Sequence, residues 1–143
     1  MKGPRTTRSC PGKGTERRGA AVVEMAIVTP LLLTMLFGII EFSWAMSVQQ
    51  TLTNASREGC RTATIKGMTE QDIRDRVDSY MEPAGLSGFT VDIVRSTALN
   101  PTESVTVSIP YADISLVGGF FPGLESKTLT ATCSMRKEGS VGS

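Results

Sequence analysis

The longest apolar stretch of this sequence, residues 20–46, constrains the fold more than any other feature. It is about long enough to cross a bilayer as a helix, which takes roughly 20 residues. One carboxylate, Glu24, lies near its start and has no partner of opposite charge close by. A charge inside a membrane costs at least a few kcal/mol, so such a residue marks a functional site by default. We therefore expect residues 20–46 to form a transmembrane helix in which Glu24 has a function.

The charge distribution predicts the orientation of that helix. Residues 2–18 carry six Lys and Arg against one Glu, although the whole chain has a net charge of only +1. A basic cluster of this kind is compatible with nucleic-acid binding, but it lacks interleaved aromatic residues and adjoins the apolar stretch. The positive-inside rule explains it better. We expect a single-pass protein of the inner membrane, with residues 1–19 as a basic cytoplasmic leader and the C-terminal domain outside the cytoplasm.

The residue types exclude several kinds of active site. The chain has no histidine, which removes Ser-His-Asp and Cys-His arrangements and the usual histidine metal sites. Its three cysteines, Cys10, Cys60 and Cys133, are far apart and form no zinc-binding pair. We expect no catalytic residue, cofactor, metal, nucleic acid or small-molecule substrate. Asp72, with its neighbours at 75 and 78, alternates with arginines, which is typical of a solvated helix face.

Helical periodicity continues past the membrane into a predicted stalk helix, residues 47–67. Ala55, Gly59 and Ala63 repeat every fourth position and form a stripe of small residues. Such a stripe allows another backbone to approach closely, either the chain's own sheet or a second helix. We favour packing under the chain's own sheet. Gly67 is a plausible C-terminal glycine for this helix.

A second helix is predicted directly after the stalk. Thr69 is a good N-cap, Asp72 stands three residues on, and Met68 and Ile73 fit a hydrophobic staple. The apolar face of this helix is expected to comprise Ile73, Val77, Tyr80 and Met81. Pro83 and Gly85 follow and end the helix.

Three strands are predicted in the remainder of the domain, at residues 89–94, 104–109 and 128–135, because apolar and polar residues alternate there. One polar and one apolar face favour a small antiparallel sheet that packs on the stalk helix. The fold class is therefore α+β, with an extracytoplasmic domain at residues 68–138 and a tail at 139–143. The loop Pro110–Ser126 is unusually apolar, and either completes the core or contacts a subunit or the membrane.

Residues 17–63 resemble a known family. A basic leader, Gly19, and an apolar helix whose fifth residue is Glu24 resemble the prepilin signal of the type IV pilin class. The run from Arg18 to Glu24, Pro30, and the segments at 37–42 and 49–59 resemble the TadE-like family of the tight-adherence (Flp) pilus system. The resemblance implies a pilin-like fold and a minor pilin or pseudopilin used in pilus assembly or an associated secretion system. The implied partners are a prepilin peptidase, other pilins or pseudopilins, and the assembly platform.

The resemblance also implies roles for three residues. A prepilin peptidase would cut between Gly19 and Ala20, and Glu24 of one subunit would pair with the new amine of a neighbour. Other interpretations remain open: Glu24 reaching the cytoplasmic headgroups, an uncleaved single-pass scaffold, or a membrane-anchored enzyme. We expect that the protein is not an enzyme.

Two cysteines form a candidate disulfide. Cys60 borders the small-residue stripe, and Cys133 lies on the apolar face of the last predicted strand. If the sheet covers the stalk helix, both thiols lie at one interface in an oxidising compartment, where a disulfide is permitted. The alternative is two buried thiols that behave as small hydrophobic groups.

Overall fold

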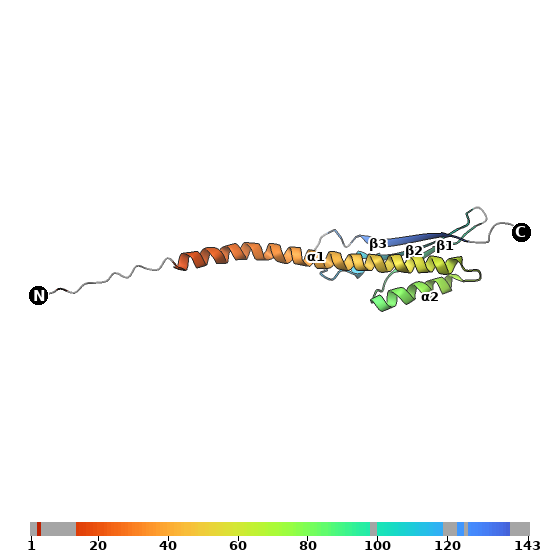
Figure 1. Ribbon diagram of the computed structural model, residues 1–143, viewed down its shortest axis with the longest axis horizontal. Helices are drawn as coiled ribbons and strands as arrows, with labels where there is room; N and C mark the ends of the chain where they lie inside the picture. Colours follow the sequence, from red (N-terminus) through yellow and green to blue (C-terminus); the bar gives the residue numbers. More distant parts are fainter. Residues whose placement is uncertain (1–2, 4–13, 98–99, 119–122, 125, 138–143) are drawn as a thin grey trace. The chain divides into compact units, whose positions relative to one another are not determined.

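The computed structural model describes residue 3 and residues 14–97, 100–118, 123–124 and 126–137. In chain order the main elements are α1 (Gly14–Thr64), α2 (Glu70–Met81), β1 (Thr90–Val94), β2 (Thr102–Pro110) and β3 (Thr128–Arg136) (Figure 1). Cys10, most of the predicted leader, part of the apolar loop and the predicted tail lie outside the described residues. The chain forms two compact units, residues 1–38 and 39–143, which are described separately.

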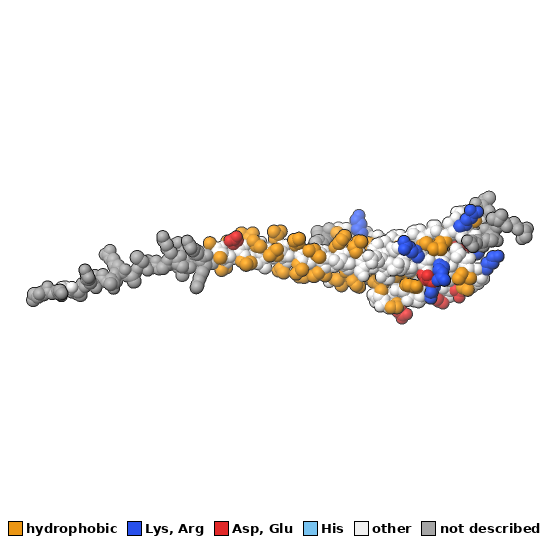
Figure 2. Space-filling model, viewed as in Figure 1, with side chains coloured by type: hydrophobic (Ala, Val, Ile, Leu, Met, Phe, Trp, Pro, Cys, Tyr) orange, Lys and Arg blue, Asp and Glu red, His pale blue; other side chains and the backbone are white. Residues whose placement is uncertain are grey.

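The first unit consists of the N-terminal part of α1. Its large apolar side chains are exposed, as are the smaller residues between them, and Pro30 lies inside the helix. Figure 2 shows these hydrophobic side chains along the helix surface. The helix is long and apolar enough to span a membrane, and no part of its apolar window is buried by the described chain. This agrees with the predicted single-pass helix.

The second unit is built on a three-stranded antiparallel sheet of order β1-β2-β3. The register places Val91 of β1 opposite Val107 of β2, and Val107 opposite Ala131 of β3. Alternation of residue types divides the sheet into two faces, as predicted. The outer face carries cross-strand hydroxyl pairs such as Thr106 with Thr132, 3.0 Å apart. The inner face is apolar and requires a cover.

Both helices supply that cover from the same side of the sheet. A Cβ added at Gly59 of α1 would lie 3.0 Å from Val77 of α2 and 3.1 Å from Val105 of β2. Gln49 and Cys60 of α1 also reach the backbone of β3. The fully buried side chains include Leu52, Ile73, Met81, Val105, Val107 and Ile109. The predicted α+β architecture, with the stalk helix packed on a three-stranded antiparallel sheet, is confirmed.

The start of α2 also agrees with its prediction. Thr69 is the N-cap and forms the complete capping box with Asp72. Ile73, Val77 and Met81 are buried, but Tyr80 is 39% exposed, so its predicted place on the apolar face is wrong. The Arg76 guanidinium instead lies over the Tyr80 ring, 5.7 Å from its centroid. This cation–π contact accommodates an aromatic residue at the edge of the buried face.

The folded unit begins earlier in α1 than the predicted stalk. The stalk was expected from residue 47, whereas the compact unit starts at Ile39 and already includes the buried Glu41 and the half-buried Trp44. The helix ends at Thr64 rather than at residue 67, and Gly67 has a φ of 87° in the following turn. The folded unit begins earlier than the predicted stalk because Glu41 and Trp44 bind the loop after β2.

Candidate assembly and processing site

The predicted processing position lies on the exposed surface of α1. Gly19 and Ala20 are both helical and exposed. A Cβ added at Gly19 would meet no atom within 4 Å, and its φ is not in the left-handed region. The packing of the chain therefore does not require glycine at position 19. A requirement for glycine there must come from outside the chain.

Glu24 lies one helical turn after Ala20, on the same side of α1, since residues four apart share a face. Its side chain is exposed among Val23, Met25 and other apolar residues. Within the described ranges, no residue forms a hydrogen bond or an ion pair with Glu24. The helix thus presents a carboxylate without a partner on an otherwise apolar surface.

The apolar surface around Glu24 suits either lipid or other apolar helices. The exposed large side chains of this unit are Val22, Val23, Met25, Ile27, Val28, Leu31, Leu32, Leu33, Met35, Leu36 and Phe37. In water such a continuous apolar surface would be far larger than monomeric proteins tolerate. A carboxylate on it has to reach headgroups or find a donor on a neighbouring molecule.

A second glutamate of α1, Glu41, has the opposite environment. It is 3% exposed, and its carboxylate accepts four hydrogen bonds from the loop after β2. Oε1 accepts from the Tyr111 hydroxyl at 2.9 Å and the Ser115 hydroxyl at 2.6 Å. Oε2 accepts from the backbone N–H groups of Leu116 at 3.1 Å and Val117 at 3.2 Å. We call Glu41 with these donors the Glu41 clamp.

Trp44 strengthens the attachment of the same loop. Its Nε1 donates to the carbonyl oxygen of Ile114 at 2.8 Å. Trp44 lies three residues after Glu41, so both side chains project from one face of α1. From the sequence alone Glu41 has no individual role, because it appears only within the segment at 37–42 that resembles the TadE-like family. A carboxylate three residues before a tryptophan, at the end of a membrane segment, was the available signal.

The small-residue stripe belongs to the domain core. Ala55 and Ala63 are fully buried, and Gly59 lies against Val77 and Val105. The favoured interpretation, in which the stripe packs under the chain's own sheet, is therefore confirmed. Cys60, next to it, is also fully buried, and its thiol donates to the carbonyl oxygen of Cys133 at 2.8 Å. Burial, together with the interaction with Cys133, raises the pKa of Cys60 to about 12.

The structure thus brings Cys60 and Cys133 together across 73 residues of chain, as free thiols. Their predicted shared interface between helix and sheet exists. The disulfide itself stays a prediction. In the part of the chain that the structure describes, no three His, Cys, Asp or Glu side chains lie close enough to hold a metal ion.

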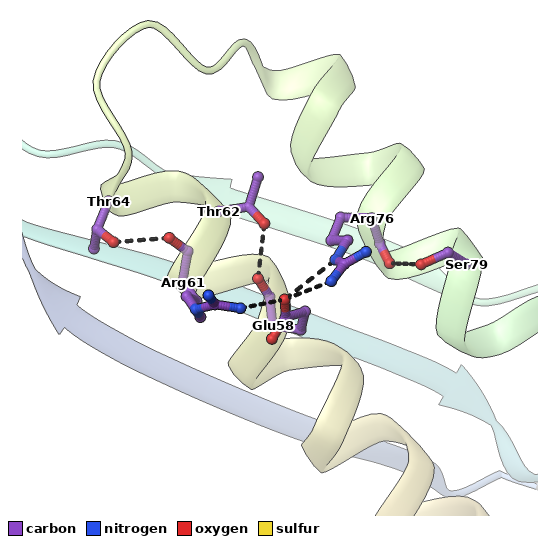
Figure 3. A network of polar contacts seen from close by, with 6 residues as sticks. All are labelled: Glu58, Arg61, Thr62, Thr64, Arg76 and Ser79. Carbon is purple, nitrogen blue, oxygen red and sulfur yellow. Dashed lines mark hydrogen bonds and ion pairs between the residues drawn. The ribbon is translucent and has the colours of Figure 1, made fainter.

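A polar cluster joins α1 to α2 at the other end of the domain (Figure 3). Glu58 Oε1 accepts from Arg76 of α2 at 2.8 Å and from Arg61 at 3.0 Å. The hydrogen bond from Arg76 is the main cause of the lowered pKa of Glu58. Asp72 caps α2, and Asp75 accepts from Gln71 at 2.7 Å. Glu58, Asp72 and Asp75 therefore each form hydrogen bonds within the folded unit.

Comparison with known proteins finds a family match to one segment of the chain. Residues 19–61 match the family model described as TadE-like protein. The match begins at Gly19, includes Glu24, Glu41 and Glu58, and ends before α2. It confirms the resemblance drawn from the sequence over that segment. No curated protein and no solved structure matches the chain significantly.

Proposed function

We propose that this chain, with its TadE-like segment, is a minor pilin or pseudopilin of a tight-adherence (Flp-type) pilus or an associated secretion system. It is anchored in the inner membrane by residues 20–38 of α1, with the leader in the cytoplasm and the folded unit outside. A prepilin peptidase cuts between Gly19 and Ala20. The partners are other pilins or pseudopilins and the assembly platform, and the chain has no catalytic activity of its own.

One combination of observations supports this proposal most strongly. The TadE-like match begins at Gly19, and Glu24 stands exposed without a partner on the apolar part of α1. Cleavage after Gly19 would create an amine at Ala20, and that amine on a neighbouring subunit is a suitable partner for the Glu24 carboxylate. An ion pair in a low-dielectric environment is favourable only when both charges are present, so pairing would couple assembly to processing.

Cleavage is tested by intact mass. The full chain is co-expressed with a prepilin peptidase and extracted from the membrane. We expect loss of residues 1–19 from the native chain, and no loss from Gly19→Val, because a branched side chain would occupy the space that glycine leaves open. Gly3→Val is the matched control, since a Cβ at Gly3 also meets no atom within 4 Å. It should be cut normally, and a native chain that still starts at Met1 would contradict the proposal.

Assembly is tested at Glu24. Glu24→Gln removes the charge, so membrane insertion becomes easier while the ionic partner of the neighbouring amine is lost. We expect an unchanged amount of protein in the membrane and a lower yield of assembled pili. Normal pilus yield from Glu24→Gln would indicate that the carboxylate only reaches headgroups.

One observation favours a second candidate, the uncleaved single-pass scaffold. α1 is continuous from Gly14 through Gly19, so the peptide bond after Gly19 lies within a helix. A peptidase must first open that turn to reach the bond. An uncut native chain that still supports pilus formation would establish the scaffold function.

A further inference from the structure

The Glu41 clamp fixes the loop after β2 to the beginning of the folded unit. Four donors from residues 111–117 converge on one carboxylate of α1, and Trp44 binds the same loop at Ile114. Hydrogen bonds to a buried charged group are stronger than neutral ones, and breaking them leaves buried polar groups unsatisfied. The loop is therefore held within a few residues of Gly38, where the first unit ends.

The surface around this clamp is apolar and exposed. Leu116, whose N–H binds Glu41, is 58% exposed. The exposed apolar side chains of α1 in the same unit are Ile39, Ile40, Phe42 and Met46. The four helical residues belong to α1, and Leu116 belongs to a loop at least 70 positions away in sequence. The clamp brings Leu116 to the same end of the unit as these residues. A single exposed leucine is common on protein surfaces. Here, however, the exposed apolar side chains of residues 39–46 follow directly after the apolar surface of residues 22–37 along α1.

The length of the membrane segment places this end of the unit near lipid. Residues 20–38 form about 28 Å of helix at 1.5 Å per residue. That length is close to the roughly 30 Å hydrocarbon core of a bilayer. Residues up to about 44 then lie in the interfacial layer, where Trp side chains such as Trp44 are enriched. This placement of the first turn of α1 in the folded unit follows from covalent continuity along the helix.

We propose that the lipid interface covers this surface, so that the clamped loop rests on the membrane with Leu116 and Phe42 among the headgroups and upper acyl chains. The proposal rests on the membrane-spanning role of α1 in the proposed function, but on neither cleavage nor pilus assembly. It gives Glu41 a positioning role: the buried carboxylate holds an apolar loop against the bilayer and so limits the tilt of the folded unit.

Spin-label accessibility in vesicles tests the proposal. The full chain is reconstituted into vesicles of phosphatidylethanolamine and phosphatidylglycerol, with Cys10 and Cys133 replaced by serine. Cys60 is retained, because its burial and raised pKa protect it from the label. A nitroxide is attached at Leu116→Cys, and its collisions with oxygen, which concentrates in lipid, are compared with those of a nickel chelate in water. The matched control is Ile65→Cys, an exposed apolar position about 35 Å further along the helix axis.

We expect the oxygen-to-nickel collision ratio at position 116 to be several-fold higher than at position 65. Adding Glu41→Gln should lower the ratio at 116, because the loop is released, and leave the ratio at 65 unchanged. A ratio at 116 equal to that at 65 would overturn the proposal in favour of a solvated loop. Low access to both reagents at 116 would overturn it in favour of a protein partner, such as a second copy of the chain.

Two further outcomes test the positioning role of Glu41 and the membrane-spanning role of α1 separately. An unchanged ratio at 116 in Glu41→Gln would overturn the positioning role of Glu41. A chain that an alkaline wash removes from the vesicles would overturn the membrane-spanning role, and the lipid contact with it. Failure of peptidase cleavage or of pilus assembly affects neither measurement, so it contradicts only the proposed function.

Discussion

The Glu41 carboxylate accepts a hydrogen bond of 2.9 Å from the Tyr111 hydroxyl, across 70 residues of sequence. This contact links α1, which is long and apolar enough to span a membrane, to the loop between β2 and β3. Glu24, in the same helix, has no such partner among the described residues. The two glutamates of the apolar stretch therefore differ in kind: Glu41 serves the fold of its own chain, and Glu24 is available to another molecule.

Replacing Glu41 by Gln should destabilise the folded unit. The amide keeps one acceptor oxygen, but its NH₂ group faces two of the four donors. Loss of the charge and of these hydrogen bonds should lower the free energy of unfolding by about 1–3 kcal/mol. Urea unfolding of the full chain in detergent, followed by the fluorescence of Trp44, measures the change. Glu24→Gln is the matched control and should unfold at the native urea concentration; equal midpoints for both variants would contradict the clamp.

Alanine should be less favourable at Gly59 than at Gly19, although both glycines lie in α1. At Gly59 the new methyl group would lie 3.0 Å from Val77 and 3.1 Å from Val105. Overpacking of this kind costs about 1–3 kcal/mol, which outweighs or cancels the roughly 1 kcal/mol gained in helix propensity. At Gly19 the methyl group meets no atom within 4 Å, so only the gain applies. Thermal unfolding should therefore show Gly59→Ala as the less stable variant, and the reverse order would refute the packing of the stripe.

The Tyr111 phenol should lose its proton at a higher pH than an unfolded tyrosine. Burial, with the hydrogen bond to Glu41, raises the pKa of Tyr111 to about 12, against about 10 for an unfolded tyrosine. The neutral phenol is the form that the fold favours, so its stabilising effect is complete below pH 10. The effect is lost as the pH rises from about 10 to 12. Tyr80→Phe leaves Tyr111 as the only tyrosine. Phenolate absorbance in that variant should have its midpoint near pH 12, and a midpoint near 10 would show that the phenol is not buried beside Glu41.

Cys60 should react slowly in the folded protein. Its thiol is fully buried, and its pKa is raised to about 12, so very little thiolate is present at pH 8. With free thiols as in the structure, iodoacetamide should label Cys60 only after denaturation, and both Cys60 and Cys133 should carry label in the denatured chain. The protein must be purified without reductant and mapped by peptide mass. Unlabelled Cys60 and Cys133 in the denatured chain would instead establish the disulfide.

Much of the architecture is encoded locally and was predictable. The apolar stretch, the N-cap at Thr69 and the alternation in the three strands each depend on residues within a few positions of one another. These patterns specify element type, one buried face per element and an antiparallel sheet. Tyr80 was misplaced because an aromatic residue at the edge of a helix face satisfies the same periodicity whether it is buried or stacked under Arg76.

The sequence by itself determined the membrane-length helix, the second helix, the three strands, and the candidate processing and assembly residues Gly19, Ala20 and Glu24. Only the tertiary structure decided what Glu41 binds and which atoms meet Gly59 and the Cys60 thiol. Their partners lie on other elements, and for Glu41 and Cys60 they lie 70 or more residues away. Periodicity records which face of a helix is turned inward, but the donor that meets a buried carboxylate depends on how distant segments pack. That packing separates Glu41, which the fold satisfies, from Glu24, which it leaves exposed.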